Sequence, residues 1–473
     1  MINLTSPDVT GMGSAHAPTR PRRSPAAVRA GAGLAIVTFL GYLPGSGRSL
    51  DFDSAQTVGM FVKTGPPWSA FRLQAAFNNH PLFSFLEQLV RVVTGRTDAA
   101  AMRVLPILCG ALAVGVLTWF AARRHGVRAG LVAGTLLATN PTFLSLSRAA
   151  RGYSLLVLCA IVATILVADD RPDRSRWSDL AYVAVAGMGL ATHLYMFPVI
   201  AAHLGAVIAR RRLDAGWRLR FAGTALVAVL AYAGMAASMF HTMGSYSRVL
   251  RTDLPWRVAV MATGGGWASV AVAPLVVAGA MLVLRRSRAT RGAAIALAGV
   301  LLVQWAVLQS SALTARFFVW LVPAAAYLAA VAVGRIRVGA LLAAASAVVA
   351  GLTMLPAFTD DPTAYRHAAA LIRQAGAMGE RSCVVNIGVS PMLAYLDSPA
   401  DFAAVTHPDD LDRCDLLVVS AWWPATADWY ARDRAVIAEA ERRFPHRLVL
   451  AHGDPTLVLS HRPLVEAPTT RPA

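Results

Sequence analysis

The chain has 473 residues, of which 56% are hydrophobic and only 15% are charged, and its mean hydropathy is +0.52. Soluble domains carry about 25% charged residues, so this composition excludes a disordered chain and a single soluble domain. The net charge of +18 rests on arginine, because Lys63 is the only lysine. The arginines fall in short groups between apolar runs, which predicts an α-helical polytopic membrane protein with no nucleic-acid partner.

Eleven apolar stretches predict membrane-spanning helices, each of which needs roughly 20 mostly apolar residues. A further stretch, Pro81–Val93, is too short to cross and contains Glu87 and Arg91, so we interpret it as an amphipathic helix on the outer membrane face. With a cytoplasmic N-terminus, most loop arginines then lie inside, as the positive-inside rule expects. The predicted spans lie near 28–45, 99–121, 127–146, 152–168, 179–193, 195–209, 219–240, 265–284, 292–311, 317–334 and 338–357.

This topology predicts three parts of the chain. Residues 1–27 form a basic cytoplasmic tail, residues 28–358 form the transmembrane domain, and residues 359–473 form a periplasmic or extracellular α/β domain. Residues 46–98 are the first periplasmic loop, which contains the amphipathic helix. The first span could also be mistaken for a signal peptide, but no small-residue cleavage site follows clearly, which favours an uncleaved span.

The C-terminal part alternates helical and strand-like segments, which predicts a small α/β domain. Cys383 and Cys414 each lie at or just before the start of a predicted strand. Adjacent parallel strands would bring the two sulfurs to one edge of the sheet, so a disulfide and two buried thiols are both open. The predicted elements are a helix over Tyr365–Ala375, strands over Cys383–Val389 and Asp415–Ala421, a helix over Trp429–Arg443 and a hairpin over Arg447–Val458.

Acidic residues are scarce in the membrane domain, and none lies in the interior of spans two to eleven. Ion- and proton-coupled transporters usually carry acids near the bilayer midplane, so this pattern argues against that class. The first periplasmic loop instead carries Asp51 and Asp53 soon after the first span, and Asn79 and His80 before Pro81. These residues indicate a polar site at the lipid boundary; the alternative is that Asp53 caps a helix.

Cationic and aromatic side chains gather at the predicted outer ends of later spans. They include Arg151 directly before the fourth span, Tyr153 at its start, His193 at the end of the fifth and Arg316 directly before the tenth. Arginine at an interface can simply extend toward lipid phosphate, and for Arg148 alone this interpretation is favoured. Several arginines and histidines on the same side as the acids indicate an anionic ligand.

The order of these motifs resembles the GT-C membrane glycosyltransferases. Within them it is similar to bacterial relatives of the protein O-mannosyltransferases and of lipid A aminoarabinose transferase (glycosyltransferase family 39-like). The resemblance covers about residues 30–360, and an external α/β tail is common in these proteins. The motifs are the acids after the first span, His80–Pro81, Arg103–Pro106, Asn140–Pro141, Ser147–Ser154, Thr192–His193 and Arg316–Phe318.

Two departures from the family pattern bear on the chemistry. The first-loop motif of the family is often Asp-Glu; Asp53 aligns with the Asp, and Ser54 replaces the Glu. Asn79 and His80 precede the helix-opening proline, where relatives often carry Glu or His. Both departures weaken the case for a two-carboxylate or metal-bridged site. A divalent metal cation is left open, although nothing here resembles a firm ligand set.

The resemblance implies transfer of a sugar from a polyprenyl-phosphate donor to a glycan, lipid or protein acceptor, on the periplasmic side of a bacterial inner membrane. A phosphate leaving group, whose second pKa is about 6, departs without a strong acid, so one base suffices and direct displacement inverts the anomeric carbon. The alternative functions are a flippase or transporter of lipid-linked glycans and a membrane anchor for a partner-binding tail. We predict Asp53 as the base with Asp51 second, His80, Arg151 and Arg316 as phosphate ligands, and Asn79, Tyr153 and His193 as lining residues.

Overall fold

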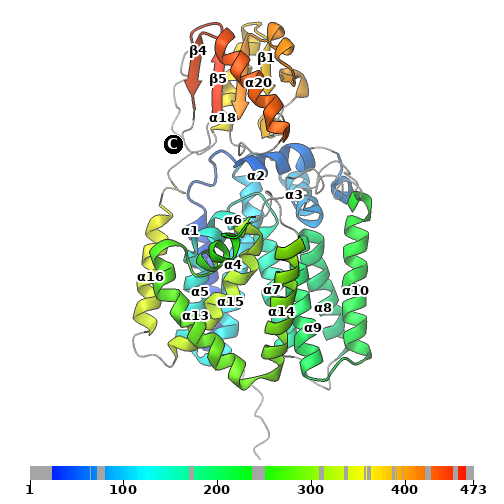
Figure 1. Cartoon of the computed structure of the whole chain (residues 1–473), viewed down its shortest axis with the longest axis vertical. Coiled ribbons are helices and arrows are strands. Elements are labelled where there is room, and N and C mark those ends of the chain that lie inside the picture. Colours follow the sequence, from blue (N-terminus) through cyan, green and yellow to red (C-terminus); the bar gives the residue numbers. More distant parts are fainter. Residues whose placement is uncertain are drawn as a thin grey trace, which may run out of the picture.

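A bundle of apolar helices carries a small sheet domain at one end (Figure 1). Helix α2 (Phe52–Thr57) lies between the two parts, and α3 (Pro81–Thr94) lies near it at the same end of the bundle. The computed structural model describes residues 24–63, 65–71, 80–169, 175–236, 251–307, 314–334, 339–355, 358, 364–385, 389, 391–396, 398–420, 428–450 and 456–464.

Each predicted span overlaps a helix, or a pair of helices, of the bundle. In the described part of the chain, four helices are long and apolar enough by themselves to cross a membrane, and one bent pair makes five. The helical membrane architecture is thus confirmed, whereas the count of eleven spans stays a prediction. The bundle helices are α1 (Pro25–Tyr42), α4 (Ala101–His125), α5 (Val127–Thr139), α6 (Pro141–Ser147), α7 (Tyr153–Ala168), α8 (Arg176–Thr192), α9 (Phe197–Ala209), α10 (Ala215–Tyr232), α12 (Leu254–Ala262), α13 (Gly266–Arg286), α14 (Arg288–Val307), α15 (Val322–Val333) and α16 (Gly339–Thr353).

A break at Asn140–Pro141 bends α5 and α6 by 67°. Proline lacks an N–H and disfavours helical backbone at the residue before it, and Asn140 accordingly has an extended ψ of 121°. The Asn140 side chain accepts a hydrogen bond from the N–H of Phe143 at 3.0 Å and so caps α6. A second bend at 148–152 leads into α7 and brings Arg151 against α2.

The amphipathic helix predicted after His80 is α3. It has 14 residues, too few to cross a membrane, and ends where Gly95 adopts a left-handed φ of +67°. Its outer surface exposes Leu89, Val92 and Val93. An exposed apolar face of this kind suits a helix at a membrane surface, which is where we predict α3 to lie.

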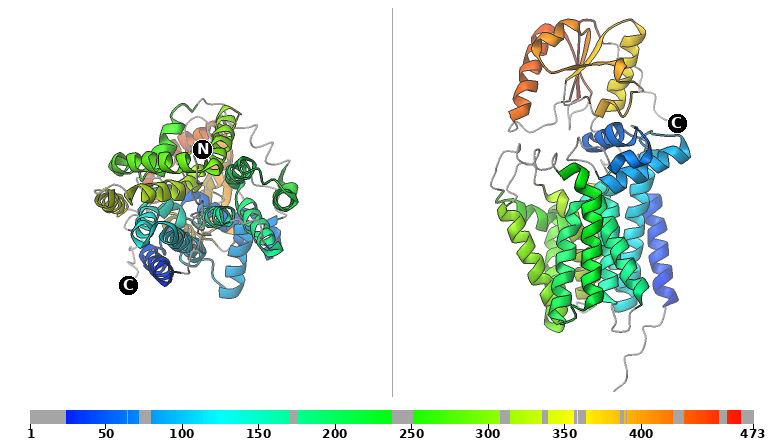
Figure 2. Two further views of the ribbon diagram at one scale, coloured as in Figure 1. Left: turned by 90° about the horizontal axis from the view of Figure 1, so that it is seen from below. Right: turned by 90° about the vertical axis from the view of Figure 1, so that its right-hand side faces the viewer.

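The C-terminal domain is built on a five-stranded sheet in the order β2-β1-β3-β5-β4. Strand β1 pairs in parallel with β2 and β3, and β5 pairs antiparallel with β3 and β4. Helices α18 and α20 flank the sheet (Figure 2). The predicted α/β domain is therefore present. Its elements are α18 (Tyr365–Ala377), β1 (Ser382–Val385), β2 (Ala403–Val405), β3 (Leu416–Ser420), α20 (Asp428–Arg443), β4 (His446–Val449) and β5 (Thr456–Ser460).

Cys383 and Cys414 form a disulfide. Cys383 lies in β1 and Cys414 comes shortly before β3, so the parallel pairing of these strands brings the two residues together. Of the two alternatives left open by the sequence, the structure has the disulfide. Cys109 and Cys159 are buried free thiols of the bundle.

Candidate active site

A cavity of about 440 Å³ lies where α2, the α6–α7 bend and the segment Ala315–Leu321 meet. Five of the site residues predicted from the sequence line this cavity, although they come from three distant segments of the chain. They are Asp51, Asp53, Arg151, Tyr153 and Arg316. The remaining lining residues are Phe52, Pro141, Thr142, Ser145, Leu146, Ala149 and Met354.

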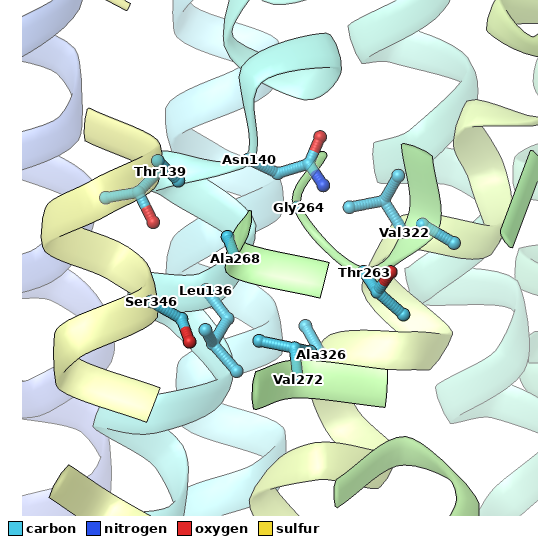
Figure 3. A pocket seen from close by; sticks show the side chains of 12 residues that line it. Leu136, Thr139, Asn140, Thr263, Gly264, Ala268, Val272, Val322, Ala326 and Ser346 are labelled. Carbon is cyan, nitrogen blue, oxygen red and sulfur yellow. The ribbon is translucent and has the colours of Figure 1, made fainter. Parts of the chain in front are cut away.

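A second cavity lies among α5, α13, α15 and α16, with Asn140, Thr263 and Ser346 at its wall (Figure 3). Its volume is about 10 Å³, which is room for one water molecule at most. Its polar side chains already bond to the backbone: Asn140 donates to the carbonyl of Met261 at 2.8 Å, and Ser346 donates to that of Leu342 at 2.8 Å. The larger cavity is therefore the candidate site.

Asp51 is the N-cap of α2, and local hydrogen bonds engage its carboxylate. Its Oδ1 accepts from the N–H of Ser54 at 3.0 Å, and its Oδ2 accepts from the hydroxyl of Ser54 at 2.6 Å. Ser54 Oγ also accepts from the N–H of Ala150 at 3.0 Å, which ties α2 to the α6–α7 bend. The capping role considered for Asp53 thus belongs to Asp51, which makes Asp51 the weaker candidate for a base.

Asp53 follows in the first turn of α2 and faces the cavity. Asp53 is 6% exposed, and its Oδ2 lies 2.7 Å from Nη1 of Arg316. Arg151 is buried and holds the same helix, because its Nη1 donates to the carbonyl of Asp53 at 3.3 Å and to Oγ1 of Thr57 at 3.2 Å. A buried carboxylate and two guanidinium groups therefore converge at one wall of the cavity.

His80, Tyr153 and His193 form a cluster of rings beside this wall, with centroids 4.8 to 5.6 Å apart. Nδ1 of His80 lies 3.0 Å from the carbonyl of Thr192, which can only accept, so Nδ1 carries the proton and Nε2 is an acceptor. Burial, assisted by the charge of Arg151, lowers the pKa of His80 well below its usual value. A neutral imidazole can orient a ligand but adds no positive charge, so the charge of the site comes from its arginines.

His80 and His193 contact the ring of Tyr153 but are not among the residues that line the cavity. Asn79 lies outside the described residues. Thr142 and Ser145 also line the cavity, from one face of α6, and were not predicted as site residues. Their spacing of three residues after the Asn-Pro motif was the signal that could have found them.

The donor groups of the cavity do not fit a divalent metal. In the part of the chain that the structure describes, no group of three or more His, Cys, Asp and Glu side chains is arranged to hold an ion. Of the two carboxylates in the wall, Asp51 caps α2 and Asp53 faces Arg316, whose positive charge repels a cation.

A family model matches part of the sequence, and solved structures share this architecture. Residues 78–236 match the family model of dolichyl-phosphate-mannose-protein mannosyltransferases. The crystal structure of ArnT from Cupriavidus metallidurans bound to undecaprenyl phosphate superposes with a TM-score of 0.62 at 16% identity, over 91% of this chain and 97% of that chain. The chain has the GT-C fold.

Two further GT-C structures give the same result. ArnT in the apo state matches with a TM-score of 0.63 at 14% identity, over 91% of this chain and 97% of that chain. The Archaeoglobus fulgidus oligosaccharyltransferase, tethered to an acceptor peptide containing the NVT sequon, matches with a TM-score of 0.56 at 12% identity, over 90% of this chain and 74% of that chain. No curated protein matches the chain significantly by sequence. The GT-C resemblance and the fold class predicted from the sequence are confirmed.

Proposed function

We propose that this GT-C protein is an integral membrane glycosyltransferase. It transfers a sugar from a polyprenyl-phosphate donor to a hydroxyl of a glycan, lipid or protein acceptor. The observation that carries the proposal is the buried Asp53 carboxylate, 2.7 Å from Arg316 at the wall of a cavity of about 440 Å³. Cavities of roughly 300–1,000 Å³ are typical of small-molecule sites, and this one has room for a sugar and its phosphate.

The two arginines of the cavity wall suit the phosphate of such a donor. A guanidinium group binds phosphate through paired, charge-assisted hydrogen bonds. Arg316 is partly exposed to the cavity, whereas Arg151 is buried and held by α2. Arg316 is therefore the more accessible of the two to a phosphate in the cavity, and Arg151 adds a second positive charge to the same wall. The ArnT structure with undecaprenyl phosphate supports a lipid phosphate as ligand of this fold.

The proposed reaction is a single displacement at the anomeric carbon. The acceptor oxygen forms a bond to that carbon while the bond from the carbon to the phosphate oxygen breaks. The bonding electrons leave with the phosphate, where Arg316 and Arg151 stabilise the charge, and the acceptor proton passes to Asp53. One displacement inverts the anomeric configuration. Tyr153, Thr142 and Ser145 line the space for the sugar.

The site and the C-terminal domain are inferred to face the periplasm of a bacterial inner membrane. In this arrangement residues 1–27 are cytoplasmic, residues 28–358 form the transmembrane domain, and residues 359–473 are periplasmic. The distribution of arginines among the loops supports this orientation. The disulfide between Cys383 and Cys414 supports it independently, because structural disulfides persist in oxidising compartments.

The proposal is tested by incubating the purified full chain with a panel of polyprenyl-phosphate hexoses and pentoses and following release of polyprenyl phosphate. We expect release with at least one donor when a suitable acceptor hydroxyl is present. Asp98→Asn serves as a control, because Asp98 lies in the same loop but pairs with Arg96 at the surface. Intact protein that binds polyprenyl phosphate and moves donors across vesicles without cleaving any of them would instead support the transporter.

A further inference from the structure

Arg103 of α4 binds the segment 46–50, which leads from α1 to Asp51. Arg103 on α4 is 7% exposed, and its guanidinium donates to three carbonyls of this segment. These carbonyls are those of Ser46 at 2.6 Å, Arg48 at 2.6 Å and Ser49 at 2.8 Å. Because a buried guanidinium needs partners for its N–H groups, these bonds fix the segment on α4.

The C-terminal domain holds the same segment from the opposite side. The hydroxyl of Tyr395 accepts a hydrogen bond from the N–H of Leu50, the residue directly before the cap of α2. The Arg366 guanidinium of α18 donates to the carbonyl of Gly47, and its backbone N–H lies 3.4 Å from Oγ of Ser49. A separate domain thus bonds to the backbone three residues before the proposed base.

A second contact lies after the π-helical turn Val58–Val62, which continues from α2. Lys63, the only lysine of the chain, donates from Nζ to the carbonyl of Leu396 at 3.2 Å. Leu396 is the neighbour of Tyr395, so one short segment of the C-terminal domain contacts the chain on both sides of α2. The carbonyl of Tyr395 accepts from Nη1 of Arg373 at 2.9 Å, which ties this segment to α18.

Apolar packing joins α2 to the core of the C-terminal domain. Leu50, Phe52, Ala55 and Val58 are buried and belong to one cluster with α18 and the central strands of the sheet. This packing buries one side of α2 against the domain, while Asp53 on the same helix faces the cavity. The helix that carries the proposed base is therefore part of the hydrophobic core of another domain.

We infer that the C-terminal domain positions the proposed base. Its segment Tyr395–Leu396 fixes the chain before and after α2 and so keeps the Asp53 carboxylate opposite Arg316. This inference rests on the proposed function of Asp53 as the base. Neither Tyr395 nor Lys63 is among the residues that line the cavity, and their bonds to Leu50 and Leu396 act on the proposed base through the backbone of α2.

Tyr395→Phe in the full-length chain is the principal test, because it removes one hydroxyl and keeps the ring. We expect kcat to fall about tenfold, since displacements of about 1 Å at a reacting group cost up to about a hundredfold. The KM for the donor and the affinity for polyprenyl phosphate stay unchanged, because Arg151 and Arg316 remain. The matched control is Tyr182→Phe, which loses a contact with His203 at 3.0 Å inside the bundle and leaves kcat unchanged.

Two further measurements keep the inference testable if Tyr395→Phe folds poorly or no donor is turned over. Lys63→Met should lower kcat several-fold, and Lys63→Arg, which can still donate to Leu396, should restore it. Hydrogen exchange over 50–57 should speed up in Tyr395→Phe and Lys63→Met relative to exchange in α13. The inference is overturned if both variants exchange over residues 50–57 at the rate of the wild type. It is also overturned if both variants have the kcat of the wild type. If the wild-type protein turns over no donor but exchange over 50–57 speeds up in the two variants as expected, the result counts against the proposed function and not against the positioning of α2.

Discussion

Oδ2 of Asp53 lies 2.7 Å from Nη1 of Arg316, so the proposed base and the cation proposed for the phosphate neutralise each other. Both groups belong to one cavity wall, and the Asp53 side chain is only 8% exposed. A donor phosphate that binds Arg316 competes with Asp53 for the same guanidinium. Binding of the donor therefore weakens the ion pair and frees the carboxylate to take the proton of the acceptor.

This competition predicts that Asp53→Asn binds polyprenyl phosphate more tightly than the wild-type protein, by about three- to tenfold, which corresponds to roughly 1 kcal/mol. The reason is that the neutral amide no longer competes for Arg316. The affinity is measured by titrating detergent-solubilised protein with polyprenyl phosphate. Asp98→Asn, which removes a surface acid from the same loop, should bind like the wild type. If Asp53→Asn binds polyprenyl phosphate equally well or more weakly than the wild type, Asp53 does not compete with the donor phosphate for Arg316.

The single base predicts inversion at the anomeric carbon. Among the described residues, the cavity wall has two carboxylates: Asp53, which we propose as the base, and Asp51, which caps α2 and accepts two hydrogen bonds from Ser54. Asp51 is therefore poorly placed to act as the nucleophile of a glycosyl-enzyme intermediate. Nuclear magnetic resonance of the product, compared with a donor of known configuration, gives the stereochemistry. A product with the configuration of the donor would contradict direct displacement.

Glu87 on α3 predicts a dependence of stability on pH. Its carboxyl group is fully buried, neither oxygen has a partner among the described residues, and burial raises its pKa well above the usual value. The folded protein then binds a proton that the unfolded chain releases. The free energy of unfolding therefore falls as the pH rises from about 4.5 toward the raised pKa, by up to about 1.4 kcal/mol per pH unit.

Glu87→Gln should remove this part of the pH dependence, because the amide keeps the shape and does not titrate. Thermal unfolding between pH 5 and pH 8 measures the effect, and the melting temperature of the variant should fall less with pH than that of the wild type. Glu441→Gln is the control, since the Glu441 side chain is 42% exposed. Parallel pH profiles for Glu87→Gln and the wild type would show that Glu87 is ionised in the folded protein.

The convergence of Asp53, Arg151 and Arg316 could be predicted from the sequence, because each lies at the end of an apolar run and the topology brings those ends to one side of the membrane. The division of roles between Asp51 and Asp53 could not, since Asp51 caps a helix that begins at Phe52, whereas Asp53 would cap one that begins at Ser54, and the sequence allows both starts. The contact of Tyr395 with Leu50 joins residues 345 positions apart and leaves no local pattern. The neutral state of His80 likewise depends on its burial and on Thr192, which only the folded chain supplies.

The disulfide between Cys383 and Cys414 should stabilise the C-terminal domain by about 2–4 kcal/mol, because it closes a loop of 31 residues in the unfolded chain. The double variant Cys383→Ser/Cys414→Ser should unfold at lower temperature than the wild type without reductant. Reductant should lower the melting temperature of the wild type and leave that of the variant unchanged. Since α2 packs on this domain, a loss of activity should accompany its unfolding. A melting temperature insensitive to both changes would show that the bond contributes little.

The most direct test of the account compares turnover and binding in Asp53→Asn. With a donor that the wild type uses, the account predicts a fall in kcat of about 10²–10⁴-fold, which is the usual contribution of a general base, while polyprenyl phosphate still binds. Turnover within a few-fold of the wild type, in a folded variant that binds polyprenyl phosphate, would show that Asp53 does not take the acceptor proton.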